Sequence, residues 1–107
     1  MTYSKFSIDR KELKDTLNVF KKLLKRKFDS TICTLKIIPG GIELSTPGIM
    51  RTIYCETEGQ QEFLVPVKLL YAYSSTSANK TMNFILYEGK MECDKSIYSS
   101  PKIKIIN

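Results

Sequence analysis

The sequence predicts an α+β domain in which two helices pack on antiparallel sheets. One stretch has the apolar spacing of an amphipathic helix, and a second stretch begins at a proline that suits a helix start. Short β-rich runs between turn residues fill the rest. The predicted order is β-α-β-β-β followed by β-α-β-β-β, which indicates an internal repeat of residues 1–58 and 59–107. At 107 residues the chain has the size of one domain with its own core.

The first helix is predicted directly after a strand over residues 2–8. Asp9 suits the N-cap, and Glu12 three positions later completes a capping-box-like pattern. The helix should fray near residues 28–30. Its apolar face has the spacing i, i+4, i+7 and i+11 and consists of Leu13, Leu17, Phe20 and Leu24.

The rest of the chain alternates strands and turns with one shorter helix. Pro66 suits the first residue of this helix, which should run to about residue 75, because the missing N–H of proline would be unpaired there. A shift of 57 positions, from 6 to 63, places Phe63 on Phe6 and Leu70 on Leu13, which supports the repeat. The other strands are predicted over residues 31–38, 42–45, 49–57, 62–65, 81–87, 90–94 and 97–105.

The net charge of +6 is concentrated in the first helix. Residues 10–27 contain eight basic and two acidic side chains, and eight minus two equals the net charge of the whole protein. At about 100° per residue, six polar side chains of this helix fall within an arc of about 100°, with no acid inside it. We call this set the lysine arc, and it consists of Lys11, Lys14, Asn18, Lys21, Lys22 and Lys25.

The lysine arc predicts a surface for a polyanion. A solvated helix face needs only to be polar, but such faces usually mix both signs of charge. An anionic membrane surface or an acidic protein are the other partners that fit the charge. Because lysine contacts phosphate as a point charge, the expected contacts are to the nucleic-acid backbone and independent of base sequence.

Several chemistries are not expected from this sequence. There is no histidine, so neither a Ser-His-Asp nor a Cys-His arrangement can form. The Pro39-Gly40-Gly41 turn lacks the lysine and serine of a phosphate-binding loop. Three widely spaced cysteines do not suit a zinc site and are expected to be buried thiols in a reducing compartment. We therefore expect no enzyme activity and no metal or other cofactor.

The chain is expected to be cytoplasmic. Its first residues lack the apolar run of a signal peptide, and no apolar stretch approaches the roughly 20 residues needed to cross a bilayer. A membrane partner is therefore not expected.

Three segments resemble one domain of a DNA sliding clamp, the ring-shaped processivity factors of replicative polymerases. These are residues 6–13, 41–44 and above all 62–70, and the resemblance covers nearly the whole chain. It implies a clamp-like domain, and rings of six such domains with helices lining the hole. In such a ring the lysines of the arc, with Lys68 on the second helix, would face DNA phosphates. Edge strands near residues 49–57 and 97–105 would join neighbours by sheet extension.

The chain also departs from the clamp pattern. Known clamps carry two or three domains on one chain, whereas this chain has one and lacks the long connector beneath which clients bind. A ring would therefore need six copies, and Pro101 is a residue typical of edge strands that resist pairing.

Two functions follow from the resemblance and the charge. The first is a non-catalytic, clamp-like protein of DNA replication that self-assembles through strand edges. It would bind duplex DNA without sequence preference. The alternative is a clamp-fold interaction module that binds or mimics replication proteins without encircling DNA.

Overall fold

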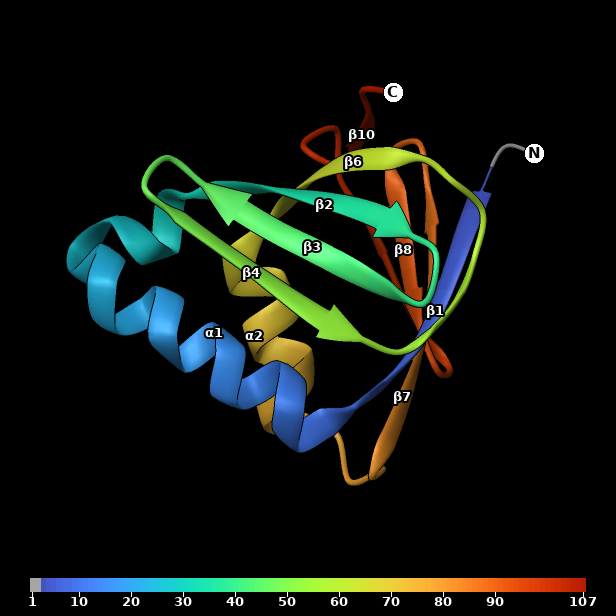
Figure 1. The fold of residues 1–107 in the computed structure, drawn as a ribbon, viewed down its shortest axis with the longest axis horizontal. Coiled ribbons are helices and arrows are strands. Elements are labelled where there is room, and N and C mark those ends of the chain that lie inside the picture. Colours follow the sequence, from blue (N-terminus) through green and yellow to red (C-terminus); the bar gives the residue numbers. More distant parts are fainter. Residues whose placement is uncertain (1–2) are drawn as a thin grey trace.

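The computed structural model describes residues 3–107, which form strands, two α-helices and a 3-10 segment, η1 (Figure 1). The predicted start of the first strand at residue 2 lies outside the described residues. The elements are β1 (Tyr3–Asp9), α1 (Arg10–Leu24), η1 (Lys25–Ser30), β2 (Ile32–Ile38), β3 (Gly41–Thr46), β4 (Ile49–Tyr54), β5 (Glu56–Glu58), β6 (Glu62–Pro66), α2 (Val67–Thr76), β7 (Thr81–Tyr87), β8 (Lys90–Cys93), β9 (Ser96–Ser99) and β10 (Lys104–Ile105).

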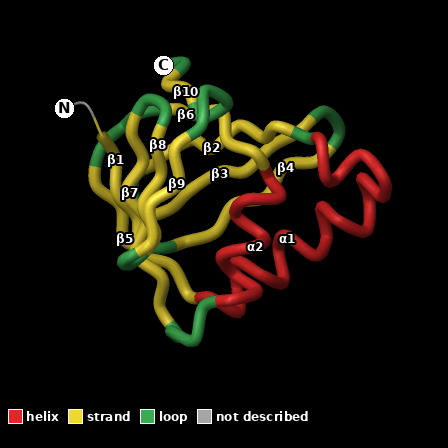
Figure 2. Tube along the Cα trace, turned by 180° about the vertical axis from the view of Figure 1, so that it is seen from behind, coloured by secondary structure: helices red, strands yellow, loops and turns green. Residues whose placement is uncertain are grey.

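The strands form two antiparallel five-stranded sheets, and each sheet takes strands from both halves of the chain. One sheet has the order β5-β1-β7-β8-β9 and the other β10-β6-β2-β3-β4. The first strand of each half joins the sheet that contains the later strands of the other half. Strand β1 of the first half pairs with β7, and β6 of the second half pairs with β2. The two helices lie side by side at one side of the molecule, and the sheets lie on the other side, so that α1 keeps an exposed outer face (Figure 2).

The core lies between the helices and the inner faces of both sheets. On β1, Phe6 and Ile8 point inward, and the ring of Phe6 stacks on Phe84 of β7 with centroids 4.7 Å apart. From α1, Leu13, Leu17 and Phe20 are fully buried, as their helical spacing predicts. The predicted α+β fold, with helices packed on antiparallel sheets, is confirmed.

The single strand predicted over residues 49–57 is wrong, because the chain crosses between the sheets at Cys55. Residues before Cys55 pair with β3 as β4, and residues after it pair with β1 as β5. Ile53 and Thr57 both point toward the interior although they lie in different sheets. The alternation of side chains therefore continues in phase across the crossing, and only the tertiary pairing reveals the break.

The single strand predicted over residues 97–105 is also divided. Pro101, which has no N–H to donate, lies in a turn closed by the Ile103 N–H and the Ser100 carbonyl at 3.1 Å. Before this turn Ile97 is 62% exposed on β9, and after it Ile103 is fully buried. Ile97 and Ile103, which a single strand would place on the same face, therefore lie in different environments.

Helix α1 begins as predicted and ends earlier than predicted. The carboxylate of Asp9 accepts a hydrogen bond from the Glu12 N–H at 3.0 Å, which confirms the N-cap. The α-helix ends at Leu24, because Lys25 has φ 54° and ψ −120°, and η1 then turns the chain toward β2. Helix α2 follows Pro66, which is the N-cap residue instead of the first helical residue.

The backbone of Lys25 yields a stability prediction. A non-glycine residue at this φ is strained, whereas glycine adopts it without a Cβ clash. We expect Lys25→Gly to be more stable than Lys25→Ala by about 1 kcal/mol in urea unfolding, although both remove the same charge. Equal free energies of unfolding for the two variants would contradict strain at this position.

Candidate nucleic-acid interface

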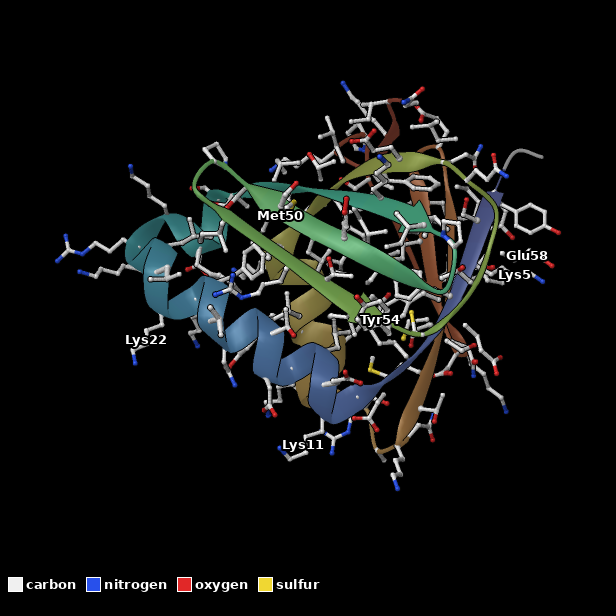
Figure 3. The ribbon with its side chains drawn as sticks, viewed as in Figure 1. Lys5, Lys11, Lys22, Met50, Tyr54 and Glu58 are labelled. Atoms are coloured by element: carbon white, nitrogen blue, oxygen red, sulfur yellow. The ribbon has the colours of Figure 1, made fainter. Side chains whose placement is uncertain are left out.

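The lysine arc is only partly preserved in the structure. Lys11, Asn18, Lys21 and Lys22 are exposed on α1, whereas Lys14 is half-buried. In Figure 3, Lys11 and Lys22 point away from the body of the protein toward the two ends of the helix. Lys25 is exposed but lies beyond the end of α1, so the helical geometry that placed it in the arc does not apply to it.

Lys11 is paired with an acid that borders the arc. Its Nζ donates to the carboxylate of Asp15, one helical turn later, at 2.8 Å. This hydrogen bond and the charge of Asp15 raise the pKa of Lys11 above its ordinary value. Both side chains are largely exposed, so the pair adds little stability, but it offsets one positive charge of the arc. The i, i+4 spacing of the two residues is a sequence signal that could have identified the pair.

This ion pair yields a prediction of increased binding. Replacing Asp15 by Asn should leave Lys11 without its counter-charge and therefore strengthen the affinity for a short DNA duplex. The slope of log K against log salt should become steeper by roughly 0.9, the value for one added phosphate contact. A titration over a range of salt concentrations measures both quantities. Weaker binding or an unchanged slope would exclude Lys11 from the interface.

The strongest concentration of free positive charge lies where α1 passes into η1. We call this group the basic end, and it consists of Lys21, Lys22, Lys25, Arg26 and Lys27. All five side chains are exposed, and none forms an ion pair with another described residue. Asp29 is the one acid between residues 21 and 30, so this stretch carries five minus one, or +4.

Arg26 and Lys27 were not among the predicted site residues. A continuous helix at about 100° per residue would turn both away from the arc. The structure replaces that helix with η1, so the expected angles do not hold after Leu24. The run of basic residues from 21 to 27 could have identified both residues from the sequence, because this signal does not require the helix to continue past Leu24.

Contacts with α2 order one member of the basic end. The Nζ of Lys21 lies 4.7 Å from the ring centroid of Tyr71, within the range of a cation–π interaction. The same tyrosine ring meets Phe28 of η1 edge to face, with centroids 5.4 Å apart. Phe28 is the buried residue of η1, so these contacts join α1, η1 and α2.

Helix α2 itself adds little charge. Lys68 is exposed and lines a shallow pocket together with Asp29, Tyr98 and Lys102. The other exposed positions of α2 are uncharged and consist of Ala72, Ser75 and Thr76. The two helices therefore differ sharply, with the positive charge on α1 and η1.

The remaining reactive groups do not form a second chemical site within residues 3–107. Burial raises the pKa of the Cys33 and Cys93 thiols to about 12 and that of Cys55 to about 11. These thiols are therefore protonated and poorly nucleophilic at neutral pH. The described residues contain no group of three side chains suited to hold a metal ion. Neither described helix has the length and apolar character needed to cross a membrane.

Two of the four edge strands among the described residues expose large apolar side chains. β4 has six residues and exposes Met50 and Tyr54, the latter to 76%, and it also carries one exposed charge, Arg51. β9 has four residues without charge and exposes Ile97 and Tyr98. Figure 3 places Met50 and Tyr54 along β4, which borders its sheet.

The other two edges are short and less suited to pairing. β5 has three residues, and both of its ends are exposed glutamates, Glu56 and Glu58. β10 has two residues, one of them Lys104. Short length and charge are the usual means by which edge strands avoid pairing with another chain.

The fold is that of a sliding-clamp domain. The chain matches a DNA polymerase III beta subunit of Thermotoga maritima with a TM-score of 0.73 at 15% identity, over 97% of this chain and 30% of that one. A sliding clamp of Pseudomonas aeruginosa, a DNA polymerase III beta subunit bound to griselimycin, matches with a TM-score of 0.71 at 16% identity, over 96% and 30%. A sliding clamp of Bartonella birtlesii, also bound to griselimycin, matches with a TM-score of 0.68 at 16% identity, over 97% and 29%.

The chain therefore spans about 30% of the length of these clamp subunits. No family model and no curated protein sequence matches it. The resemblance inferred from the sequence is confirmed at the level of the domain fold.

Proposed function

We propose that this chain is a non-catalytic, sliding-clamp-like protein that binds the backbone of duplex DNA without sequence preference and assembles with copies of itself. The observation that carries the proposal is the basic end, five exposed cations that form no ion pair within residues 3–107, on a clamp-domain fold. The proposed contacts are the predicted residues of the arc and α2, now extended by Arg26 and Lys27. The predicted residues are Lys11, Lys14, Asn18, Lys21, Lys22, Lys25 and Lys68.

The chemistry of these contacts supports binding without base readout. Exposed lysines neutralise phosphate charge and release condensed counterions, which makes the affinity fall steeply with salt. Lysine lacks the planar, two-pronged donor geometry of the arginine guanidinium, and four of the five cations of the basic end are lysines. Such a surface can hold a duplex and still allow it to move along the protein.

Self-assembly is proposed through β4 and β9. These edges combine unpaired backbone groups with exposed apolar side chains, and the added strand of a neighbour would cover both. The proposed joining edges are smaller than the predicted regions 49–57 and 97–105. These regions also include β5 and β10, which lie at the opposite borders of the two sheets. We further propose that residues 1–107 act as one domain built from repeats 1–58 and 59–107, and that six copies would close a ring. The proposed setting is DNA replication in the cytoplasm.

Two measurements on the unmodified chain test this proposal. Binding to a short duplex of arbitrary sequence should weaken steeply with salt and should be equal for a second duplex of unrelated sequence. Light scattering should give a mass well above the 12.3 kDa of one chain, and six times that value for a ring. A monomer that binds no duplex at low salt would contradict the proposal. It would favour a module that contacts replication proteins without DNA.

A further inference from the structure

Tyr71 occupies a central position beside the basic end without carrying charge. Its ring lies between Lys21 of α1, with the Nζ 4.7 Å from the ring centroid, and Phe28 of η1, with centroids 5.4 Å apart at 87°. The side chain is half-buried and packs against the core. One aromatic ring therefore contacts both segments that supply the cations.

The geometry suits a ring that fixes the position of a cation. The face of an aromatic ring is electron-rich, and an ammonium group within about 6 Å of the centroid is attracted to it. Lysine otherwise has a flexible stem whose ordering on binding costs conformational entropy. A lysine already held in place loses less freedom when it meets a phosphate, which is the general benefit of preorganisation.

Lys21 is distinguished from its neighbours by this contact. Lys22, Lys25 and Lys27 have no aromatic ring beneath them among the described residues. The other lysines above tyrosine rings, Lys5 and Lys90, lie on β1 and β8. Figure 3 places Lys5 on the far side of the molecule from Lys22.

We propose that Tyr71 is a positioning residue for DNA binding, which holds Lys21 in the orientation that contacts phosphate. The inference rests on the proposed function. It assigns α2 a role that its own charge does not suggest, because α2 orders a cation of α1 in addition to offering Lys68.

A double-mutant cycle with a short DNA duplex tests this role. Tyr71→Leu keeps an apolar side chain but removes the ring, and it should weaken binding about two- to fivefold. The salt slope should not change, because no charge is lost. Lys21→Gln should instead make the slope shallower by roughly 0.9. Tyr71→Phe keeps the ring and should bind as the unmodified protein does.

The cycle separates positioning from a general structural effect. In the Lys21→Gln background, Tyr71→Leu should cause no further loss of affinity, because the cation that it orders is absent. A further loss of the same size, or no loss from Tyr71→Leu alone, would overturn the inference. Thermal unfolding of each variant confirms that the fold is intact before binding is compared.

A second readout does not involve DNA. The methylene protons of Lys21 next to its ammonium group should show an upfield NMR shift from the ring current of Tyr71, retained in Tyr71→Phe and lost in Tyr71→Leu. A protein that binds duplex without this shift overturns the positioning role alone. A protein that shows the shift but binds no duplex overturns the proposed function, and the positioning role with it.

Discussion

Replacing Lys21, Lys22 and Arg26 together by glutamine is expected to reduce the affinity for duplex DNA on the order of 10³-fold at roughly 50 mM salt. Each lost phosphate contact makes the log–log salt slope shallower by roughly 0.9, so three contacts remove roughly 2.7. At about 1 M salt counterion release no longer contributes, so the affinities of the variant and the unmodified protein should be nearly equal there. As the salt concentration falls from about 1 M to roughly 50 mM, the difference in slope produces the expected loss of affinity. Fluorescence anisotropy with a labelled duplex measures both the affinity and the slope.

A matched control removes the same charge elsewhere. Lys36, Lys90 and Lys104 lie on the outer faces of the sheets, on β2, β8 and β10, and their replacement by glutamine also lowers the net charge by three. This control should retain most of the affinity, because its cations are outside the proposed interface. Equal losses in the two triple variants would mean that net charge alone, and no local site, accounts for the binding.

Placing lysines on the open edges is expected to convert the assembled protein into a monomer. Met50→Lys and Ile97→Lys put a charge on β4 and β9, where a paired neighbour would have to bury it. Because both side chains are more than 60% exposed in the single chain, the substitutions should leave its own stability nearly unchanged. Light scattering should then give a mass near 12.3 kDa at concentrations where the unmodified protein is larger.

The control for this experiment uses another exposed apolar residue. Ile106 is 47% exposed and follows β10, one of the two short edges. Ile106→Lys adds the same charge and should leave the mass of the assembly unchanged. If the double variant keeps the mass of the unmodified protein, β4 and β9 are not the joining edges.

The local features of this protein could be predicted well from the sequence. The apolar spacing on α1 identified Leu13, Leu17 and Phe20 as core residues, and the short side chain of Asp9 identified the N-cap. Such features depend on residues within a few positions of one another, where the period of the backbone sets the pattern. The concentration of charge between residues 10 and 27 is likewise a property of the chain itself.

The candidate site was predicted only in outline. The helical arc identified Lys21 and Lys22, which the structure leaves exposed and without an ion pair to another described residue. The arc also included Lys11, whose charge Asp15 offsets, and Lys25, which lies beyond the helix. The arc placed Lys25 by projecting an ideal helix past its true end at Leu24, and the role of Lys25 in binding stays a prediction.

The sequence by itself determined the helix faces, the class of fold and the location of the charge, because these follow from local periodicity and composition. Only the tertiary structure decided the crossings between sheets at Cys55 and near Pro101, since strands of either sheet show the same alternation. It also brought Tyr71 beneath Lys21, a contact between residues 50 positions apart (71 minus 21). Contacts of this kind depend on how whole elements pack, and the spacing of residues along one helix contains no information about its neighbour.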